Sequence, residues 1–261
     1  MIRVDKHPTH WTLWLDAPAT RNALTADMVQ TIHTTVHSMA SDTTVRALVL
    51  RGADGHFCAG GDFSSFQDMM ATPAPSQGID PIATANRAFG LLLQQLQRSD
   101  VMTLAVVQGA AMGGGCGLAA VCDWVLADHT ASFGTPELSL GLPPAQIAPF
   151  LQRRLGTSRS MQLMVQTQRL NALQAFEHGL IDELLQDVDT GLQAWQAHWQ
   201  RAEPAALRAT VQLLRKGQAA DSLNSTLDFA AQQFAASLRS GTAAEGLAAR
   251  QAKRSPDWTR P

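Results

Sequence analysis

Three consecutive glycines at 113–115 and the carboxylate of Glu137 are the residues whose types and spacing best suit chemistry. The glycines begin a run of small and apolar residues that ends at Val121, a pattern typical of the start of a buried helix. Backbone N–H groups at a helix N-terminus attract an oxygen that carries or develops negative charge. Such donors beside an acid are suited to a reaction that passes through an enolate.

A second glycine loop, FCAGGD at 57–62, follows the apolar run VRALVLR at 45–51. The apolar run predicts a strand that is covered on both faces. Ligands in α/β sheets gather at loops beyond the carboxyl ends of strands, so this loop is well placed to form part of a site. The alternative is that both glycine runs serve only tight turns and close packing.

Two other uses of the glycines do not fit their spacing. A Walker A loop needs Gly-Lys-Ser/Thr, and no lysine follows Gly117. A dinucleotide fingerprint needs G-x-G-x-x-G, whose third glycine is missing at Leu118 and beyond. His33 and His37 come nearest to a metal pair, but they lie on a predicted surface helix without a third ligand. We therefore expect no NAD, ATP or metal.

The composition predicts a globular protein with a sizeable core. The chain has 261 residues, 45% of them hydrophobic, and a formal net charge of −2, which does not favour a nucleic-acid or membrane surface. No apolar run reaches membrane-spanning length, and the first eleven residues lack a signal-peptide layout. Cys58, Cys116 and Cys122 show no CxxC spacing; we interpret them as reduced packing residues of a cytoplasmic protein rather than as nucleophiles.

Short buried strands alternate with helices along the first two thirds of the chain, and helices dominate after Pro144. This alternation predicts a wound α/β core. Thr25 is a predicted N-cap, and Asn171 with Gln174 resembles a capping box. The strands are expected at 11–15, 45–51, 101–108, 123–127 and 131–133. The helices are expected at 26–38, 63–70, 81–98, from the triple glycine onward, 147–155, 158–166, 171–178, 189–202, 204–216 and 221–239.

Four motifs occur in a fixed order: FCAGGD, GGGCGLAAVCD, FGTPELSLG and NALQAFEHGLIDEL. Together they resemble the enoyl-CoA hydratase/isomerase (crotonase) superfamily over most of the chain. The resemblance implies the ClpP/crotonase-like wound ββα spiral core, expected at 1–200, and a C-terminal helical region at 201–261 that builds trimers or hexamers. It also implies an acyl-CoA thioester as substrate, with coenzyme A as part of that substrate and no separate cofactor or metal.

The resemblance also assigns roles to particular residues. The backbone N–H groups of Gly61 and Gly114 match the two donors that hold the thioester oxygen, and Glu137 matches the acid/base that handles the proton on the α-carbon. Their neighbours Gly60 and Asp62 are expected to contact the substrate. Two fixed donors stabilise a developing oxyanion by several kcal/mol in a dry site.

The chain departs from the two-glutamate hydratases of this family at two places. Gly117 stands where those enzymes carry a first glutamate that activates water, and GLPPAQIAPF at 141–150 replaces a glycine-rich loop. A single glutamate is typical of Δ3,Δ2-enoyl-CoA isomerases, which is one alternative. The combination with NRAFG at 86–90 is more similar to the isohexenylglutaconyl-CoA hydratase branch. A further alternative is a non-catalytic, crotonase-fold binding protein, which the retained Glu137 does not favour.

A substrate of that branch carries a free carboxylate and a branched alkyl tail. Arg87 is our candidate for the cation that meets the carboxylate, and Gln146 is a candidate for orienting water. Arg21 is expected to meet the coenzyme A phosphates. Three apolar residues after the FCAGGD loop are expected to line the acyl pocket: Phe63, Phe66 and Met70.

Overall fold

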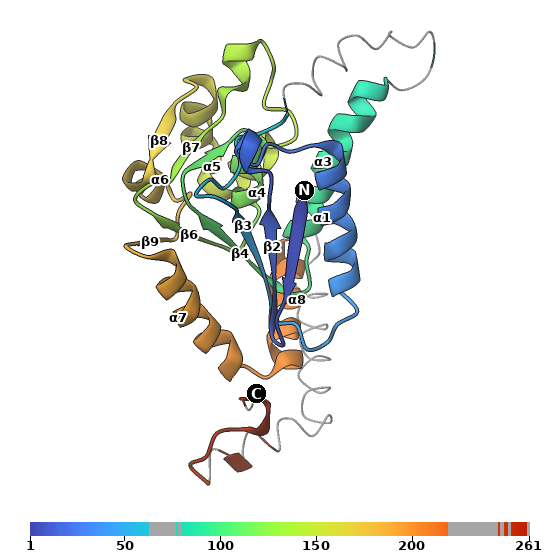
Figure 1. Ribbon diagram of the computed structural model, residues 1–261, viewed down its shortest axis with the longest axis vertical. Coiled ribbons are helices and arrows are strands. Elements are labelled where there is room, and N and C mark those ends of the chain that lie inside the picture. Colours follow the sequence, from blue (N-terminus) through green and yellow to red (C-terminus); the bar gives the residue numbers. More distant parts are fainter. Residues whose placement is uncertain (63–76, 78–79, 219–244, 246–247, 250–251, 260–261) are drawn as a thin grey trace.

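The computed structural model describes residues 1–62, 77, 80–218, 245, 248–249 and 252–259 (Figure 1). The helices predicted at 63–70 and 221–239 lie outside the described residues. So do the three predicted pocket residues Phe63, Phe66 and Met70.

A six-stranded sheet forms the centre of the fold, in the order β1-β2-β3-β4-β6-β9 (Figure 1). Strand β1 is antiparallel to β2, and every other neighbouring pair is parallel. The predicted α/β class is therefore confirmed, although β1 and β9 were not anticipated. The strands are β1 (Ile2–Lys6), β2 (His10–Leu15), β3 (Ala47–Gly52), β4 (Met102–Val107), β6 (Trp124–Asp128) and β9 (Glu183–Leu185).

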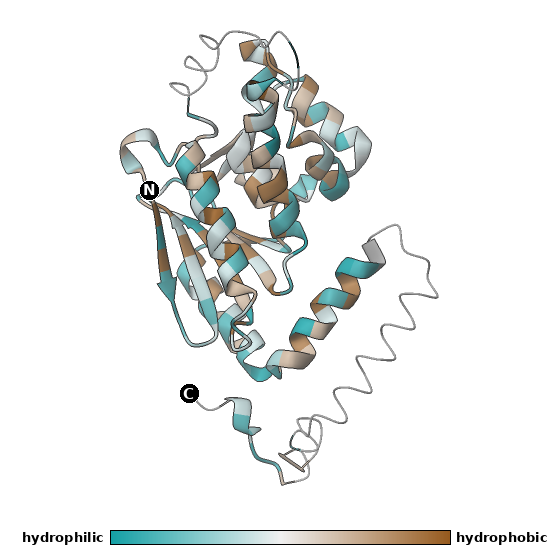
Figure 2. Cartoon of the chain, turned by 90° about the vertical axis from the view of Figure 1, so that its right-hand side faces the viewer, coloured by the Kyte–Doolittle hydropathy of each residue, from teal (hydrophilic) through white to brown (hydrophobic). Residues whose placement is uncertain are grey.

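Both faces of this sheet are covered, which explains why β3 and β4 are almost continuously apolar. On one face, Leu48 and Leu50 belong to a cluster formed with α1, α3, α4 and α5. On the other, Ala47 and Val49 pack in a cluster with α7 and α8. Figure 2 shows hydrophobic and hydrophilic residues interspersed along the helices, as expected of helices with one buried face. The helices are α1 (Ala26–Met39), α3 (Pro81–Gln97), α4 (Gly114–Ala120), α5 (Ala148–Val165), α6 (Ala172–His178), α7 (Val188–Arg201) and α8 (Pro204–Gln218).

A second, three-stranded sheet in the order β5-β7-β8 was not anticipated in this form, because only β7 was expected as a strand. Its members are β5 (Ala110–Met112), β7 (Ser132–Gly134) and β8 (Arg169–Asn171), each three residues long. A three-residue strand is too short to show an alternating pattern. Strands β5 and β7 are parallel and place the residues that follow them, Gly113 and Thr135, side by side.

Local signals fixed several helix ends as predicted. The Thr25 hydroxyl accepts a hydrogen bond from the Met28 N–H at 3.3 Å at the start of α1. The capping box of α6 is present, with Asn171 and Gln174 each bonded to the other's backbone. The two helices expected on either side of Gly156 form one element, α5, that is kinked at this glycine.

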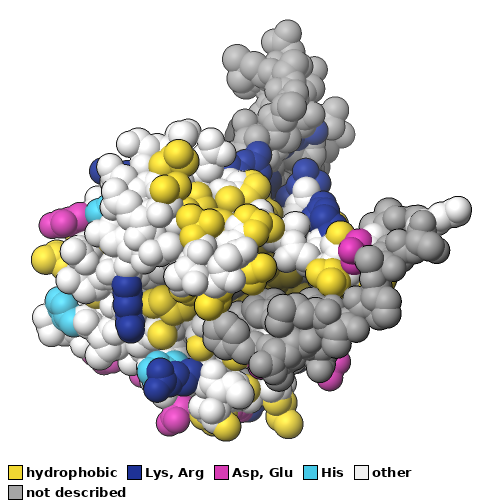
Figure 3. All heavy atoms as spheres, turned by 90° about the horizontal axis from the view of Figure 1, so that it is seen from above, with side chains coloured by type: hydrophobic (Ala, Val, Ile, Leu, Met, Phe, Trp, Pro, Cys, Tyr) yellow, Lys and Arg dark blue, Asp and Glu magenta, His cyan; other side chains and the backbone are white. Residues whose placement is uncertain are grey.

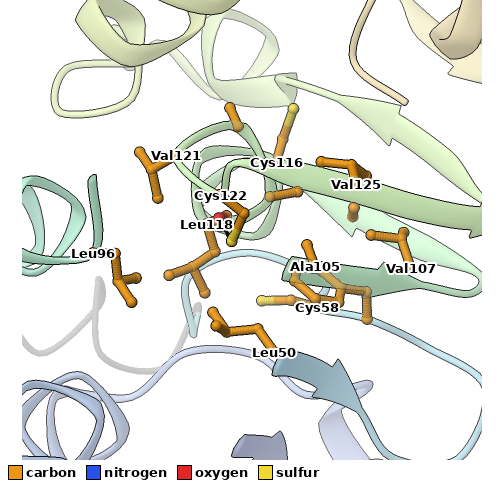
Figure 4. Packing of buried hydrophobic residues seen from close by; sticks show 14 of the residues in the cluster. Leu50, Cys58, Leu96, Ala105, Val107, Cys116, Leu118, Val121, Cys122 and Val125 are labelled. Carbon is orange, nitrogen blue, oxygen red and sulfur yellow. Dashed lines mark hydrogen bonds between the residues drawn. The ribbon is translucent and has the colours of Figure 1, made fainter. Parts of the chain in front are cut away.

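The three cysteines are buried in the apolar cluster that α4 forms with the sheet, among residues such as Leu50, Leu118 and Val125 (Figure 4). Burial raises the pKa of each thiol to about 12. A thiol that stays protonated is a poor nucleophile, so the packing interpretation is favoured. None of the described helices combines the length and hydrophobicity that crossing a bilayer requires.

Candidate active site

The two predicted oxyanion donors lie on two neighbouring segments. One is the FCAGGD loop, which pairs with β5 through Cys58, and the other is the start of α4, which follows β5. Gly114 is the first residue of α4, where its N–H points out of the helix N-terminus. Gly61 follows the Cys58 segment and forms a parallel bridge with Leu24. Within the described part of the chain, no group accepts a hydrogen bond from the N–H of Gly61 or of Gly114. Both donors are thus available to a ligand oxygen.

Backbone hydrogen bonds hold these two segments together. The Cys58 N–H donates to the Ala110 carbonyl at 2.8 Å, and the Met112 N–H donates to the Cys58 carbonyl at 2.9 Å. Two residues after Cys58, a Cβ built on Gly60 would lie 3.1 Å from the Met112 carbonyl oxygen. Gly60 therefore allows close backbone approach, and the substrate contact expected of it stays a prediction.

Glu137 lies against the turn that begins α4. It belongs to the 3-10 helix η2 (Pro136–Leu140), directly after β7. Gly113 has φ of +49°, and a Cβ on it would lie 2.7 Å from Glu137 Oε1. Because only a glycine leaves room there, the sequence places this carboxylate beside the N-terminus of α4. The geometry matches the predicted pairing of Glu137 with the glycine helix.

The carboxyl of Glu137 is partly buried and forms no ion pair with the described residues. Its Oε2 atom is buried and has no hydrogen-bond partner. Burial raises the pKa of the carboxyl above its ordinary value, because removal from water disfavours the charged form. A partly buried carboxyl with a free oxygen can take up and return a proton near the operating pH.

Phe89 is a site residue to which the sequence reasoning gave no role. A Cβ built on Gly114 would lie 3.3 Å from Phe89 Cζ and 3.1 Å from Leu24 Cδ1. These two apolar side chains therefore flank the Gly114 donor and keep its surroundings apolar. Phe89 lies within the NRAFG segment, which the sequence had marked only through a resemblance.

Gln146 and Arg87 meet on the exposed side of α3. Gln146 Nε2 donates to Asn86 Oδ1 at 2.9 Å, and Gln146 Oε1 lies over Gly90, where a Cβ would overlap it. Arg87 Nη1 would lie 3.0 Å from a Cβ built on Gly90. Among the described residues, Arg87 has no acidic partner. The structure thus brings Arg87 and Gln146 together beside Gly90. Phe89 is two residues from Arg87 and lies on a different face of α3.

Arg21 lines a cavity whose lining residues do not include Glu137. Its backbone carbonyl accepts from the Ala59 N–H at 3.0 Å, which attaches it to the FCAGGD loop. The cavity has a volume of about 390 Å³ and also contains His56 and Arg169. Two cationic side chains at one cavity suit an anionic ligand group. Asp62 is half-buried beside Gly61, with its N–H bonded to the Leu24 carbonyl at 3.1 Å.

Among the described residues, no three His, Cys, Asp or Glu side chains gather as a metal site would need.

Comparisons with known proteins agree with this geometry. The sequence profile of the family described as Enoyl-CoA hydratase/isomerase matches residues 11–261. The 2,3-dehydroadipyl-CoA hydratase of Escherichia coli strain K12 is 31% identical, with 94% of this chain and 93% of the relative covered.

Two solved structures are similar over nearly their whole length. An enoyl-CoA hydratase/isomerase from Marinobacter aquaeolei superposes with a TM-score of 0.94 at 35% identity, and 99% of each chain is covered. Pseudomonas aeruginosa AtuE superposes with a TM-score of 0.92 at 37% identity and the same coverage.

The buried carboxyl of Glu137 predicts a pH-dependent effect on stability. Its raised pKa means that the folded state prefers the protonated form, so the ionised form destabilises the fold as pH rises through the folded-state pKa. We expect Glu137→Gln to raise the Tm at pH 8, by about 2–4 °C for each ~1 kcal/mol. The gain should vanish near pH 4, where the wild-type carboxyl is also neutral.

The Tm of wild type and of Glu137→Gln is measured by thermal unfolding between pH 4 and pH 8. Glu177→Gln is the matched control, because Glu177 is exposed on α6 and its substitution should leave the Tm unchanged. A Glu137→Gln gain that persists unchanged at pH 4 would contradict the desolvation argument.

Proposed function

Because the chain belongs to the enoyl-CoA hydratase/isomerase (crotonase) family, we propose that it is an enoyl-CoA hydratase. It adds water across the C2=C3 double bond of an acyl-CoA thioester. The observation that carries the proposal is the buried, unpartnered oxygen of Glu137 beside two free backbone donors, on Gly61 and Gly114.

The two backbone donors stabilise the charge that the reaction develops. In the proposed reaction, the thioester carbonyl oxygen accepts hydrogen bonds from the Gly61 and Gly114 N–H groups. When hydroxide adds to C3, the electron pair of the double bond moves through C2 onto this oxygen and forms an enolate. The positive end of the α4 dipole and the apolar neighbours Phe89 and Leu24 favour that charge.

Glu137 can then serve both proton transfers in turn. As a carboxylate it takes a proton from water while the remaining hydroxide adds to C3. As a carboxylic acid it gives the same proton to C2, and the enolate collapses to the saturated thioester. Water is consumed, no proton is left over, and Glu137 returns to its starting state. A raised pKa suits a group that has to act first as base and then as acid.

We further propose that the acyl group is a branched, glutaconyl-type one of the isohexenylglutaconyl kind. The family relative from Escherichia coli is named for the thioester of a dicarboxylic acid, which supports a carboxylated acyl group. In this chain Arg87 has no acidic partner among the described residues and lies beside Gln146. A guanidinium in that position suits a carboxylate at the far end of the acyl chain.

The phosphate end of coenzyme A is assigned to the cavity that contains Arg21. Arg21 is attached to the FCAGGD loop through Ala59, so its cavity adjoins the segment that carries the Gly61 donor. Arg169 brings a second guanidinium to the same cavity. Coenzyme A enters as part of the substrate, and the proposed reaction needs no separate cofactor.

A Δ3,Δ2-enoyl-CoA isomerase is the second candidate. A double-bond shift needs one base that moves a proton from C2 to C4, and Glu137 alone is sufficient for it. The observation that favours this candidate is the absence of a second acid at Gly117, where an apolar side chain occupies the space.

We propose that the chain assembles as a cytoplasmic homotrimer or hexamer, in which the core at 1–200 carries the acyl-CoA site and the helical region at 201–261 builds the trimer. Exposed hydrophobic side chains support an interface, and Figure 3 shows such side chains gathered on the face seen from above. Those on η2, the loop after it, α5 and α6 are Leu138, Leu140, Leu142, Met161, Val165, Leu173 and Phe176.

Loss of the conjugated enoyl-thioester absorbance tests the reaction class. Crotonyl-CoA, 3-methylglutaconyl-CoA and isohexenylglutaconyl-CoA are each incubated with wild type, Glu137→Gln and the control Glu177→Gln. We expect fast loss with the carboxylated, branched thioesters and a kcat lower by about 10²–10⁴ in Glu137→Gln. If no band is lost and the same band appears from a 3-enoyl-CoA, the enzyme is the isomerase instead.

Arg87 and Arg21 are expected to give different kinetic signatures. Losing one charge-assisted contact of about 1.5–3 kcal/mol should raise KM roughly 10- to 100-fold. Arg87→Ala should do so for carboxylated thioesters only, whereas Arg21→Ala should do so for every thioester, because all share coenzyme A. KM values, or inhibition constants where turnover is slow, make the comparison. An equal effect of Arg87→Ala on crotonyl-CoA would remove its role with the carboxylate.

Gln146 is predicted to orient the attacking water. Removing one neutral hydrogen bond costs about 1 kcal/mol, so Gln146→Ala should lower the hydration rate by roughly fivefold. Gln152→Ala, on the exposed side of α5, is the matched control. An unchanged hydration rate in Gln146→Ala ends this role.

A further inference from the structure

Gly113, the N-cap of α4, and Gly114, its first residue, each precede Gly117 by about one helical turn, and each of the three glycines is covered by a different side chain. Glu137 covers Gly113, and Phe89 covers Gly114. At Gly117 the cover is Ile147, which precedes the first residue of α5. Two-glutamate relatives carry an acid at the position of Gly117. In this chain, Ile147 from the loop before α5 occupies the space of that side chain.

The contact at Gly117 is too close for any side chain there. A Cβ built on Gly117 would lie 2.5 Å from Ile147 Cγ2 and 3.2 Å from Ile147 Cβ, with Leu93 Cδ1 at 3.6 Å. Real Cβ atoms do not approach other carbon atoms to 2.5 Å, so one side chain has to move. Gly117 is thus required by packing and not by an unusual backbone conformation.

Ile147 has little freedom to move aside. It is 3% exposed, and Leu93 is fully buried beside it. Its carbonyl accepts hydrogen bonds from the Phe150 and Leu151 N–H groups, which ties its backbone to the first turn of α5. A β-branched side chain on a fixed backbone has few alternative rotamers.

The position of Ile147 also matters for the ligand. Side chains of a helix lean back toward its N-terminus, so a side chain at position 117 would extend over the turn that contains Gly113 and Gly114. Ile147 fills that volume from the other side. Gly114, one turn before Gly117, is covered by Phe89 and Leu24. Ile147 therefore continues an apolar lining along the same helix.

We propose that Ile147 is a specificity-determining residue. It fills the space that a side chain at position 117 would otherwise occupy, so only one of the two can be present. This inference rests on the proposed enoyl-CoA chemistry. Ile147 excludes both an acid and its water from this side of the site and offers an apolar wall instead. An alkyl substituent on the acyl chain gains contact with that wall, whereas a short unbranched chain leaves it uncovered.

The sign of the Tm change caused by Gly117→Ala tests the contact between positions 117 and 147. Replacing a glycine inside a helix by alanine ordinarily stabilises it. Here we expect Gly117→Ala to lower the Tm in the wild-type background, because the new Cβ meets Ile147. In the Ile147→Ala background the same substitution should raise the Tm, because the space is then open.

Gly117→Glu extends the test to specificity. Ile147→Ala alone should lower the Tm by about 5–15 °C. Combined with Gly117→Glu, the total loss should be smaller than the sum of the two single losses. The double variant should hydrate crotonyl-CoA at least tenfold faster than wild type and lose part of its preference for branched thioesters.

Val49→Ala is the matched control for both experiments, since Val49 is equally buried but packs on the opposite face of the sheet. Its Tm loss should add to that of Gly117→Ala without a change of sign. Strict additivity between positions 117 and 147 would overturn the packing pair, whatever the activity. The Tm values can show coupling between positions 117 and 147 even if wild type and all variants leave every enoyl thioester unchanged. In that case the packing pair stands, but the proposed function and the specificity role fail.

Discussion

The geometry of the site depends on backbone pairing between the FCAGGD loop and β5. Two hydrogen bonds, from Cys58 to Ala110 and from Met112 to Cys58, set the distance between the segments that carry the two donors. The Gly113 N–H in turn donates to the Gly134 carbonyl at 2.8 Å, and Glu137 follows three residues later. Because these contacts are backbone to backbone, the donors and the carboxylate keep their relative positions without help from any exposed side chain.

Such a rigid frame allows the site to contain groups that weaken the fold. Glu137 Oε2 is buried without a partner, and the N–H groups of Gly61 and Gly114 have no acceptor among the described residues. A buried oxygen without a hydrogen-bond partner costs about 1–3 kcal/mol. In the proposed reaction, an intermediate with a negative oxygen and a mobile proton would give partners to all three groups at once.

The sequence was sufficient for the parts of the fold that depend on local physics. Thr25 and Asn171 cap their helices through bonds to residues three positions away, which a linear pattern can show. Glu137, Gly61 and Gly114 could be predicted as site residues because motifs fix their positions, and their catalytic roles stay predictions. Strands β5 and β8 were missed because three residues carry no period. Phe89 was missed because its role arises from contact with Gly114, 25 residues away.

The two departures from the two-glutamate pattern illustrate this limit best. In the sequence, Gly117 and the altered loop before α5 are 30 residues apart and read as independent changes. In the structure they are one contact, because the isoleucine of that loop fills the space that the glycine leaves. Each change alone is expected to lower stability: a glycine without Ile147 leaves a cavity, and Ile147 opposite a larger side chain overlaps it. The loss of the acid and the gain of the apolar wall are thus a single physical substitution, made from two places in the chain.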